Sequence, residues 1–290
     1  MTQAQFRPRR SVLFLPGSNA RALEKAKTLP CDVVAIDLED ASAPELKASS
    51  RDAVVAAIAA GGFGRREVVV RVNGLDTPWG EADLKAMSEA GPDAILVPKI
   101  ATAGDVARYD SRLSHAPEKT RLWVMIETAR ALFHLEGIAA SSANTRLACM
   151  AMGPNDLARE TGFRLGGARE PLWPAMSMTV AAAHAFGLTA LDGVFNGLDD
   201  AEGLTRECQQ AQAFGFDGKT LIHPNQIGPC NTVFSPSPGE IAWAQAVIAA
   251  FADPANAGKG ALRVDGKMVE GMHLIQAERL IVAAKAAADA

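Results

Sequence analysis

The sequence predicts a (β/α)8 barrel, the TIM-barrel fold, with a C-terminal helical extension. Short apolar runs, typical of strands buried on both faces, alternate eight times with longer stretches of helical character. Most of these runs end in a polar or charged cluster, and barrels place their active sites at that end of the strands. A chain of 290 residues, 48% of them hydrophobic, is long enough to form such a barrel and its core.

Eight strands are expected, and seven helices are expected between them. The strands are residues 11–15, 33–36, 68–72, 94–97, 122–126, 147–152, 189–195 (the least hydrophobic) and 218–222. The helices are residues 20–29, 45–60, 80–90, 103–113, 131–140, 173–186 and 201–214. An open doubly wound sheet would show the same alternation. The polar clusters favour the barrel, because strands far from the switch point of an open sheet have no reason to end this way.

The domain boundary is expected near residue 232, so that residues 1–232 form the barrel and residues 233–290 form the extension. The breaker at 235–239 precedes a helical segment over 240–252, and a hairpin-like turn over 264–269 precedes an amphipathic helix from about Gly271. This extension lies outside the eight repeats. It is therefore expected to pack on the barrel or on a neighbouring subunit.

Composition indicates a protein that acts on small molecules. The 29 Lys and Arg residues against 33 Asp and Glu residues give a net charge of −4, which argues against a nucleic-acid or anionic-membrane surface. Four cysteines far apart in the chain form no CxxC pair, so neither a zinc site nor a disulfide framework is expected, and a reducing cytoplasm is the expected location. No segment resembles a signal-peptide core or a membrane span.

Glu127 and Asp156 form the predicted metal site. Each follows an apolar run, at the ends of what would be adjacent strands, and two carboxylates without nearby His or Cys suit Mg²⁺ or Mn²⁺. Such a site leaves positions for water and a chelating 2-oxo acid, and the turn of Gly153, Pro154 and Asn155 beside it is expected to contact substrate. Both acids also lie where a helix begins, so helix capping is the alternative.

Arg71 ends a strand of valines and is expected to point into the barrel mouth. There its guanidinium can bind a carboxylate or stabilise an enolate oxygen. An ion pair with the acids Asp37, Glu39 and Asp40 is the alternative, and both can hold together. Asp37 and Glu39 share one side of their strand end, so they rank above Asp40 as residues that orient Arg71 or the metal's water ligands.

Other polar residues allow two interpretations each. Lys99 suits a Schiff base or an electrostatic role, and His223 suits a general base or a structural hydrogen bond, with Asp192 orienting either. Basic residues near the N-terminus can hold the phosphates of a large substrate beside the Pro16-Gly17 turn, although a solvated basic helix face explains them as well. These basic residues are Arg9, Arg10, Arg21, Lys25 and Lys27.

The ordered set of motifs resembles the citrate lyase beta subunit and malyl-CoA lyase group of the HpcH/HpaI aldolase superfamily. The resemblance runs from about Arg9 to Leu280. Its motifs are Ser11-x-Leu13-Phe14-x-Pro16-Gly17, Asp37-Leu38-Glu39-Asp40-Ala41, Arg71-Val72-Asn73, Pro98-Lys99, Glu127-Thr128-Ala129, Asp156-Leu157 and His223-Pro224-x-Gln226-Ile227.

The resemblance implies a TIM barrel that assembles as a trimer or hexamer and uses Mg²⁺ on a CoA thioester. It implies that Glu127 and Asp156 are the metal ligands, that Arg71 lies beside the reacting carbonyl, and that the acids around Glu39 support them. The Pro16-Gly17 turn and the basic helix after it, with Arg21 and Lys25, are similar to the part that contacts CoA. A small-molecule CoA ester and a 2-oxo acid are the implied partners.

One position departs from the resemblance. The family's C-terminal Gly-x-Met-Val/Ile-Asp motif supplies an aspartate to the active site of an adjacent subunit as acid or base, whereas this chain has Glu270 after Val269. The side chain is longer by one methylene, and a displacement of about 1 Å can cost on the order of 100-fold in rate. The substitution puts the identity of the substrate and any thioesterase activity in question.

The expected reaction is cleavage of a 3-hydroxyacyl-CoA, such as malyl-CoA, citramalyl-CoA or citryl-CoA, into acetyl-CoA (or a homologue) and a 2-oxo acid, or the reverse condensation. Three alternatives stay open. They are a CoA-independent metal-dependent aldolase that releases pyruvate, a malyl-CoA-type thioesterase, and a scaffold without activity that would show no Mg²⁺ dependence.

Overall fold

The computed structural model describes residues 7–288, and the chain divides into two compact units. The first unit is Arg9–Asn231, and the second is built mainly from the segment that begins at Thr232. No helix among the described residues is long and apolar enough to cross a membrane.

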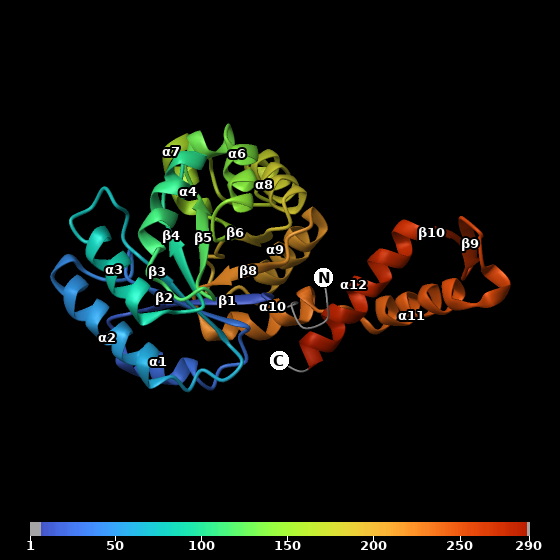
Figure 1. Ribbon diagram of the computed structural model, residues 1–290, viewed down its shortest axis with the longest axis horizontal. Coiled ribbons are helices and arrows are strands. Elements are labelled where there is room, and N and C mark those ends of the chain that lie inside the picture. Colours follow the sequence, from blue (N-terminus) through green and yellow to red (C-terminus); the bar gives the residue numbers. More distant parts are fainter. Residues whose placement is uncertain (1–6, 289–290) are drawn as a thin grey trace. The chain divides into compact units, whose positions relative to one another are not determined.

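The first unit is a closed barrel of eight parallel strands in sequence order, which confirms the predicted fold (Figure 1). β8 closes the barrel by pairing with β1, with Ser11 opposite Lys219 and Leu13 opposite Leu221. The strands are β1 Ser11–Pro16, β2 Val33–Asp37, β3 Glu67–Arg71, β4 Ala94–Val97, β5 Arg121–Ile126, β6 Leu147–Met152, β7 Thr189–Asp192 and β8 Gly218–Leu221.

The α-helices of this unit surround the barrel and cover the outer face of its strands (Figure 1). They are α1 Ala20–Ala26, α2 Lys47–Ala60, α3 Gly80–Ala90, α4 Ala103–Asp110, α5 Ala129–Leu132, α6 Leu135–Ala140, α7 Pro154–Thr161, α8 Trp173–Ala185, α9 Ala201–Phe214 and α10 Ile227–Phe234, which runs on past Asn231. Side-chain caps start several of them, as when Thr128 accepts the N–H of Ala131 at the start of α5.

Two sequence predictions about these elements were wrong, and two helices had no predicted range. The helix predicted over 131–140 is two short helices, α5 and α6. No range was predicted for α7, of which only the start near Asp156 was expected, or for α10. The strand predicted over 189–195 ends at Asp192, because the chain leaves the sheet at Gly193, whose α-carbon packs against Pro154 too closely for a side chain. The segment after Asp192 is therefore a loop near α7.

Apolar side chains fill the interior of the barrel. The cluster includes Val33, Val69, Leu96 and the fully buried Trp123. Arg9 lies at the N-terminal end of the strands, because it hydrogen-bonds Glu67 and Thr189, the first residues of β3 and β7, at 2.7 Å each. The guanidinium of Arg9 also lies 4.9 Å from the Trp123 ring centroid. This packed end leaves the opposite end of the barrel for the site.

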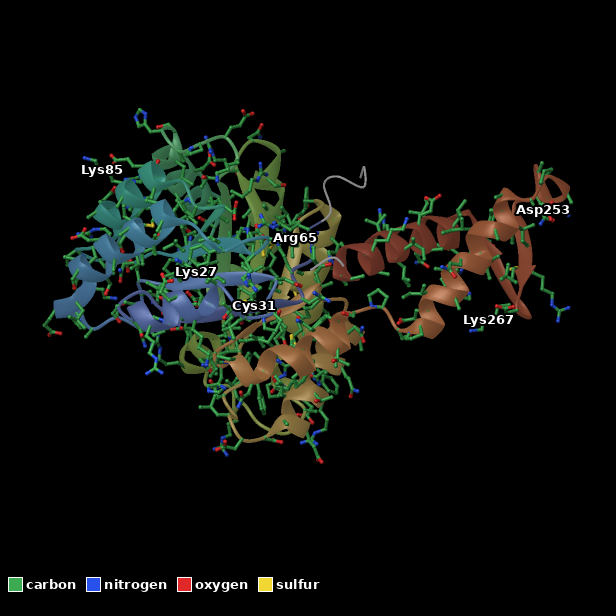
Figure 2. All side chains as sticks on the ribbon, turned by 90° about the horizontal axis from the view of Figure 1, so that it is seen from below. Lys27, Cys31, Arg65, Lys85, Asp253 and Lys267 are labelled. Atoms are coloured by element: carbon green, nitrogen blue, oxygen red, sulfur yellow. The ribbon has the colours of Figure 1, made fainter. Side chains whose placement is uncertain are left out.

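The second unit is a pair of long helices with a two-stranded hairpin between them. Its elements are α11 Pro238–Ala252, β9 Ala261–Val264, β10 Lys267–Glu270 and α12 Gly271–Ala288. Asp253 follows α11 and Lys267 opens β10 (Figure 2). The turn between the strands has φ of 48° at Asp265 and 80° at Gly266, as a two-residue hairpin requires. A small core holds the unit together, formed by Ala244, Val247, Leu262, Val264, Val269 and Ala277.

Candidate active site

A cavity of about 390 Å³ lies at the C-terminal ends of the strands. Eight of the predicted site residues line it, namely Pro16, Asp37, Arg71, Glu127, Gly153, Pro154, Asn155 and Asp156. The sequence did not single out other lining residues, among them Phe14, Met125, Met152, Asn196 and Thr220. Four of these five residues belong to strands of the barrel. Alternate side chains of such a strand point toward the barrel axis, so the alternation along each strand is the sequence signal that could have identified them.

Glu127 follows the last residue of β5 and is buried at the base of the cavity. Its side chain is 2% exposed, and its Oε1 atom accepts the backbone N–H of Lys99 at 2.8 Å. Burial, together with the nearby charges of Glu39 and Asp156, raises the pKa of Glu127 to about 7. A buried carboxyl surrounded by other carboxylates favours a cation beside it.

Gly153 makes this position of Glu127 possible. A β-carbon at Gly153 would lie 2.5 Å from Glu127 Oε2 and 2.6 Å from its Cβ atom, which is closer than such atoms approach. The turn after β6 therefore passes directly over Glu127 because it carries glycine there. This close contact explains why the predicted substrate-binding turn has glycine at position 153.

Asp156 lies in the first turn of α7, where Pro154 occupies an N-terminal position of the helix. Its carboxylate forms an ion pair with Arg159, one turn further on. Asp156 thus has the favourable helix-terminal location that the capping alternative expected, and it lines the same cavity as Glu127. Glu127 precedes Thr128, the residue that caps α5, so helix capping does not explain Glu127.

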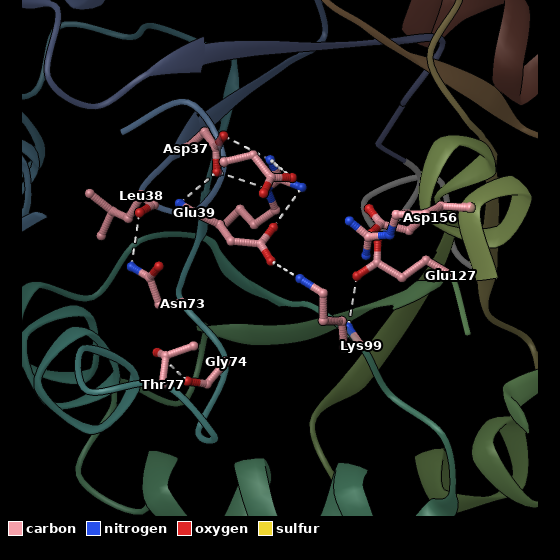
Figure 3. Close-up of polar contacts among 12 residues, drawn as sticks. Asp37, Leu38, Glu39, Asn73, Gly74, Thr77, Lys99, Glu127 and Asp156 are labelled. Carbon is pink, nitrogen blue, oxygen red and sulfur yellow. Dashed lines mark hydrogen bonds and ion pairs between the residues drawn. The ribbon is translucent and has the colours of Figure 1, made fainter. Parts of the chain in front are cut away.

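Arg71, the last residue of β3, is ion-paired with Asp37 at the end of β2 and with Glu39 just after it. The two acids are labelled in Figure 3. The Nε and Nη2 atoms of Arg71 each lie 2.7 Å from an oxygen of Asp37, and Nη1 lies 2.9 Å from Glu39 Oε2. Burial alone would lower the pKa of Arg71, but the hydrogen bonds and charges of these acids raise it well above its usual value. Asp40, 3.5 Å away and largely exposed, is the weaker partner, as the sequence predicted.

Arg71 forms the ion pair expected as the alternative interpretation, and it also reaches the cavity. The guanidinium is ion-paired with Asp37 and Glu39, it lines the cavity, and it lies 5.0 Å from the ring centroid of Phe14. Asp37 is also fixed by the backbone N–H groups of Glu39 and Ala41, each 2.9 Å away. Arg71 is therefore held in place before any substrate arrives.

Lys99 lies between Glu39 and Glu127. Its Nζ atom is 2.6 Å from Glu39 Oε1. Partial burial alone would lower the pKa of Lys99, but the hydrogen bond and charge of Glu39 raise it above its ordinary value. A Schiff-base lysine needs a neutral amine, so this geometry argues against the Schiff-base interpretation and for the electrostatic one.

A buried polar network behind these acids was missed by the sequence analysis. Lys47 Nζ donates to the carbonyl oxygens of Leu38 and Glu39 and to Asn73 Oδ1, at 2.9, 2.5 and 2.8 Å. Asn73 Nδ2 in turn donates to Leu38 O at 2.8 Å and to Asp83 Oδ2 at 2.6 Å. The turns that present Glu39 and Arg71 are thus tied together from behind.

Two other predicted residues, Asp192 and His223, have structural roles outside the cavity. Asp192 forms buried ion pairs with Lys219, 2.6 Å away, and with Arg169. His223 Nδ1 accepts the N–H of Asn225 at the start of a short 3-10 helix, which supports the structural interpretation of His223. Neither Asp192 nor His223 belongs to the group that lines the cavity.

The basic residues near the N-terminus separate into two groups. Arg9 and Arg10 do not lie at the predicted rim, because both precede β1 and so lie at the opposite end of the barrel, where Arg10 pairs with Asp32. Arg21 and Lys25 are exposed on α1, the helix that follows the Pro16-Gly17 turn. Neither Arg21 nor Lys25 lines the cavity itself.

The residues of the site fit a divalent cation with an open coordination sphere. Within residues 7–288, no group of three or more His, Cys, Asp or Glu side chains is arranged to hold a metal ion. Glu127 and Asp156 both line the cavity, and two carboxylates with several water or substrate ligands are typical of Mg²⁺.

Comparisons with known proteins agree with this fold. Residues 10–224 match the family model described as HpcH/HpaI aldolase/citrate lyase. The chain is 45% identical over 284 residues to a (3S)-malyl-CoA thioesterase of Cereibacter sphaeroides, covering 98% of this chain and 97% of the relative. It is 34% identical over 301 residues to an L-malyl-CoA/beta-methylmalyl-CoA lyase of the same species, covering 95% and 94%.

A solved structure is similar over nearly the whole chain. This is CitE of Mycobacterium tuberculosis in complex with magnesium, acetoacetate and coenzyme A, with a TM-score of 0.76 and 31% identity. The match covers 95% of this chain and 97% of CitE. Magnesium and CoA are thus bound by a protein of this architecture.

Proposed function

Because the chain belongs to the HpcH/HpaI aldolase/citrate lyase family, we propose that it is a Mg²⁺-dependent enzyme that hydrolyses a malyl-CoA-type thioester. The observation that carries the proposal is the 45% identity, over 98% of the chain, to a (3S)-malyl-CoA thioesterase. The relative named as a lyase is only 34% identical. The comparisons therefore favour the thioesterase alternative over the carbon–carbon lyase that the sequence analysis put first.

Glu127 and Asp156 would hold the Mg²⁺ ion at the base of the cavity. When bound, the ion supplies Lewis-acid chemistry to the oxygens of the 3-hydroxyacid part of the substrate. Arg71 lines the same cavity and is fixed by Asp37 and Glu39, so its guanidinium can bind an anionic oxygen without reorganising. Hydrolysis adds water to the thioester carbonyl, breaks the C–S bond and releases CoA thiol and a carboxylate.

The CoA part of the substrate would extend from the cavity past Pro16 and Gly17. Gly17 has no room for a side chain, because a β-carbon there would lie 2.9 Å from Val54 and 3.0 Å from Leu38. The exposed Arg21 and Lys25 follow on α1, where their charges can bind phosphate. Gly153, Pro154 and Asn155, on the other side, would contact the acyl part.

Glu270 is proposed to act in the site of an adjacent subunit of a trimer or hexamer, in the place of the family's aspartate. It is the last residue of β10, and its backbone N–H donates to His273 Nδ1 at 3.0 Å. A carboxylate moved by one methylene changes how a proton is delivered to or taken from the substrate, so the substitution bears on which of the two reactions the site favours. We propose the cytoplasm as the location, since all four cysteines are buried free thiols.

The proposal is tested by incubating the protein with Mg²⁺ and malyl-CoA, citramalyl-CoA or citryl-CoA. Loss of thioester, free thiol and 2-oxo acid are followed together, with Glu127→Gln as the control. Free thiol without a 2-oxo acid is the expected result. A 2-oxo acid without free thiol would establish a lyase instead, and turnover of a hydroxy-oxo acid without CoA would establish an aldolase. Turnover that is indifferent to Mg²⁺ would contradict the metal site.

A further inference from the structure

Lys99 joins the two halves of the site, and the proposed function gives it no role. Its backbone N–H donates to Glu127 Oε1 at 2.8 Å, while its Nζ atom donates to Glu39 Oε1 at 2.6 Å (Figure 3). The other carboxylate oxygen of Glu39 contacts Arg71. One residue therefore contacts the proposed metal ligand with its backbone and the partner of Arg71 with its side chain.

The backbone of Lys99 has an uncommon conformation. Its φ is 53°, in the left-handed region. Among the described residues, only two others that are not glycine have a positive φ, namely Arg169 and Asp265. Residues with a side chain adopt this conformation at a cost, and they keep it where the surrounding structure holds them. At Lys99 this conformation lets the N–H reach Glu127 while the side chain reaches Glu39.

We propose that Lys99 is a positioning residue that fixes Glu127 and the Glu39–Arg71 pair relative to each other. The inference rests on the proposed metal site. The N–H of Lys99 occupies Oε1 of Glu127 and so orients this carboxylate for the cation. The ammonium of Lys99 holds Glu39, which is 7% exposed, and through Glu39 it holds Arg71. The backbone of Lys99 therefore governs metal affinity, and its side chain governs turnover.

The backbone role is tested by comparing Lys99→Gly with Lys99→Val in the full-length protein. Both variants lose the ammonium, so any direct effect of the lost charge on metal binding is the same in both. Glycine accepts a positive φ, whereas a β-branched valine opposes it and displaces the N–H. Mn²⁺ binding to the substrate-free protein, measured by electron paramagnetic resonance, is expected to be about 10-fold weaker in Lys99→Val than in Lys99→Gly.

The side-chain role is tested with Lys99→Met and Lys99→Arg, which keep a long stem and differ in charge. Lys99→Met is expected to lower kcat about 10-fold relative to Lys99→Arg, while the two KM values for the thioester differ by less than about 3-fold. A residue that merely supports folding would not separate kcat from KM in this way. Thermal unfolding of each variant shows whether it is folded before its kinetics are compared.

The outcomes distinguish the inference from the function on which it rests. Equal Mn²⁺ affinity in Lys99→Gly and Lys99→Val, or equal kcat in Lys99→Met and Lys99→Arg, would overturn the role of Lys99 while the metal site stands. Wild-type protein that binds no Mn²⁺ would refute the metal site and the inference with it. If Lys99→Val does not fold, the methionine and arginine pair still decides the side-chain role.

Discussion

Lys47 Nζ lies 2.8 Å from Asn73 Oδ1, and both side chains are buried behind the acids that hold Arg71. Lys47 belongs to α2 and Asn73 to the turn after β3, so their hydrogen bond links the segments that carry Glu39 and Arg71. Neither side chain lines the cavity. The site thus depends on polar groups that no substrate touches.

Replacement of Asn73 by alanine is expected to destabilise the protein by about 2–4 kcal/mol, because it leaves Lys47 Nζ, Leu38 O and Asp83 Oδ2 short of a buried partner. Urea unfolding measures this change. Ser49→Ala on the exposed face of α2 is the matched control, since its hydroxyl bonds only to Leu46 O, and it should change stability by less than about 0.5 kcal/mol. Equal stability of the two variants would contradict a structural role for the buried network.

Gly153→Ala is expected to weaken Mg²⁺ binding at least 10-fold, since the added methyl group would lie 2.5 Å from Glu127 Oε2 and must displace that side chain. Calorimetric titration with Mg²⁺ measures the affinity. Gly239→Ala is the control, because a β-carbon there meets nothing within 4 Å. A variant at Gly153 that binds Mg²⁺ normally would show that Glu127 is not a ligand.

Metal affinity is expected to depend on pH through Glu127. A carboxyl with a pKa of about 7 is mostly protonated at pH 6 and mostly ionised at pH 8, and only the ionised form binds a cation. Mn²⁺ affinity of the substrate-free protein should therefore rise about 10-fold from pH 6 to pH 8. Glu127→Gln should bind more weakly and lose this dependence, so an unchanged pH profile in that variant would assign the titration to another group.

The fully buried Lys219 is expected to matter more for stability than any exposed ion pair. Its ammonium lies 2.6 Å from Asp192 and 3.1 Å from Glu207, and removing it leaves buried negative charge with only Arg169 to compensate it. Lys219→Met should therefore cost about 3–5 kcal/mol in urea unfolding. Arg206→Ala, which breaks an exposed pair with Glu202, should cost less than about 1 kcal/mol.

The barrel and the floor of its cavity could be predicted from sequence because both follow from local patterns. Glu127 comes directly after an apolar strand, and Arg71 is the last residue of another. Because the strands are parallel, such residues meet at one end of the barrel. Asp156 was found for the same reason, although only the start of its helix was predicted and not its extent. Pro154 at its start and Gly162 after its end were the signals for that helix.

Residues whose partners are distant in the chain could not be placed in this way. Arg9 and Arg10 come just before β1, whereas Pro16 is its last residue. The strand therefore places the two arginines at the end of the barrel opposite the cavity, although they are close to Pro16 in sequence. Lys47 reads as one more exposed lysine of a helix, because nothing nearby in sequence shows that Asn73 and Leu38 surround its ammonium. Long-range contacts of this kind appear only once the strands are assembled.

The packing of Arg9 against Glu67, Thr189 and Trp123 has a kinetic consequence. With this end of the barrel filled, the described part of the unit offers reactants no passage along its axis. Substrate and products therefore use the opposite end of the barrel, where the cavity lies. The product that lies deeper in the cavity leaves after the product nearer its opening, so the order of product release is set by depth rather than by affinity.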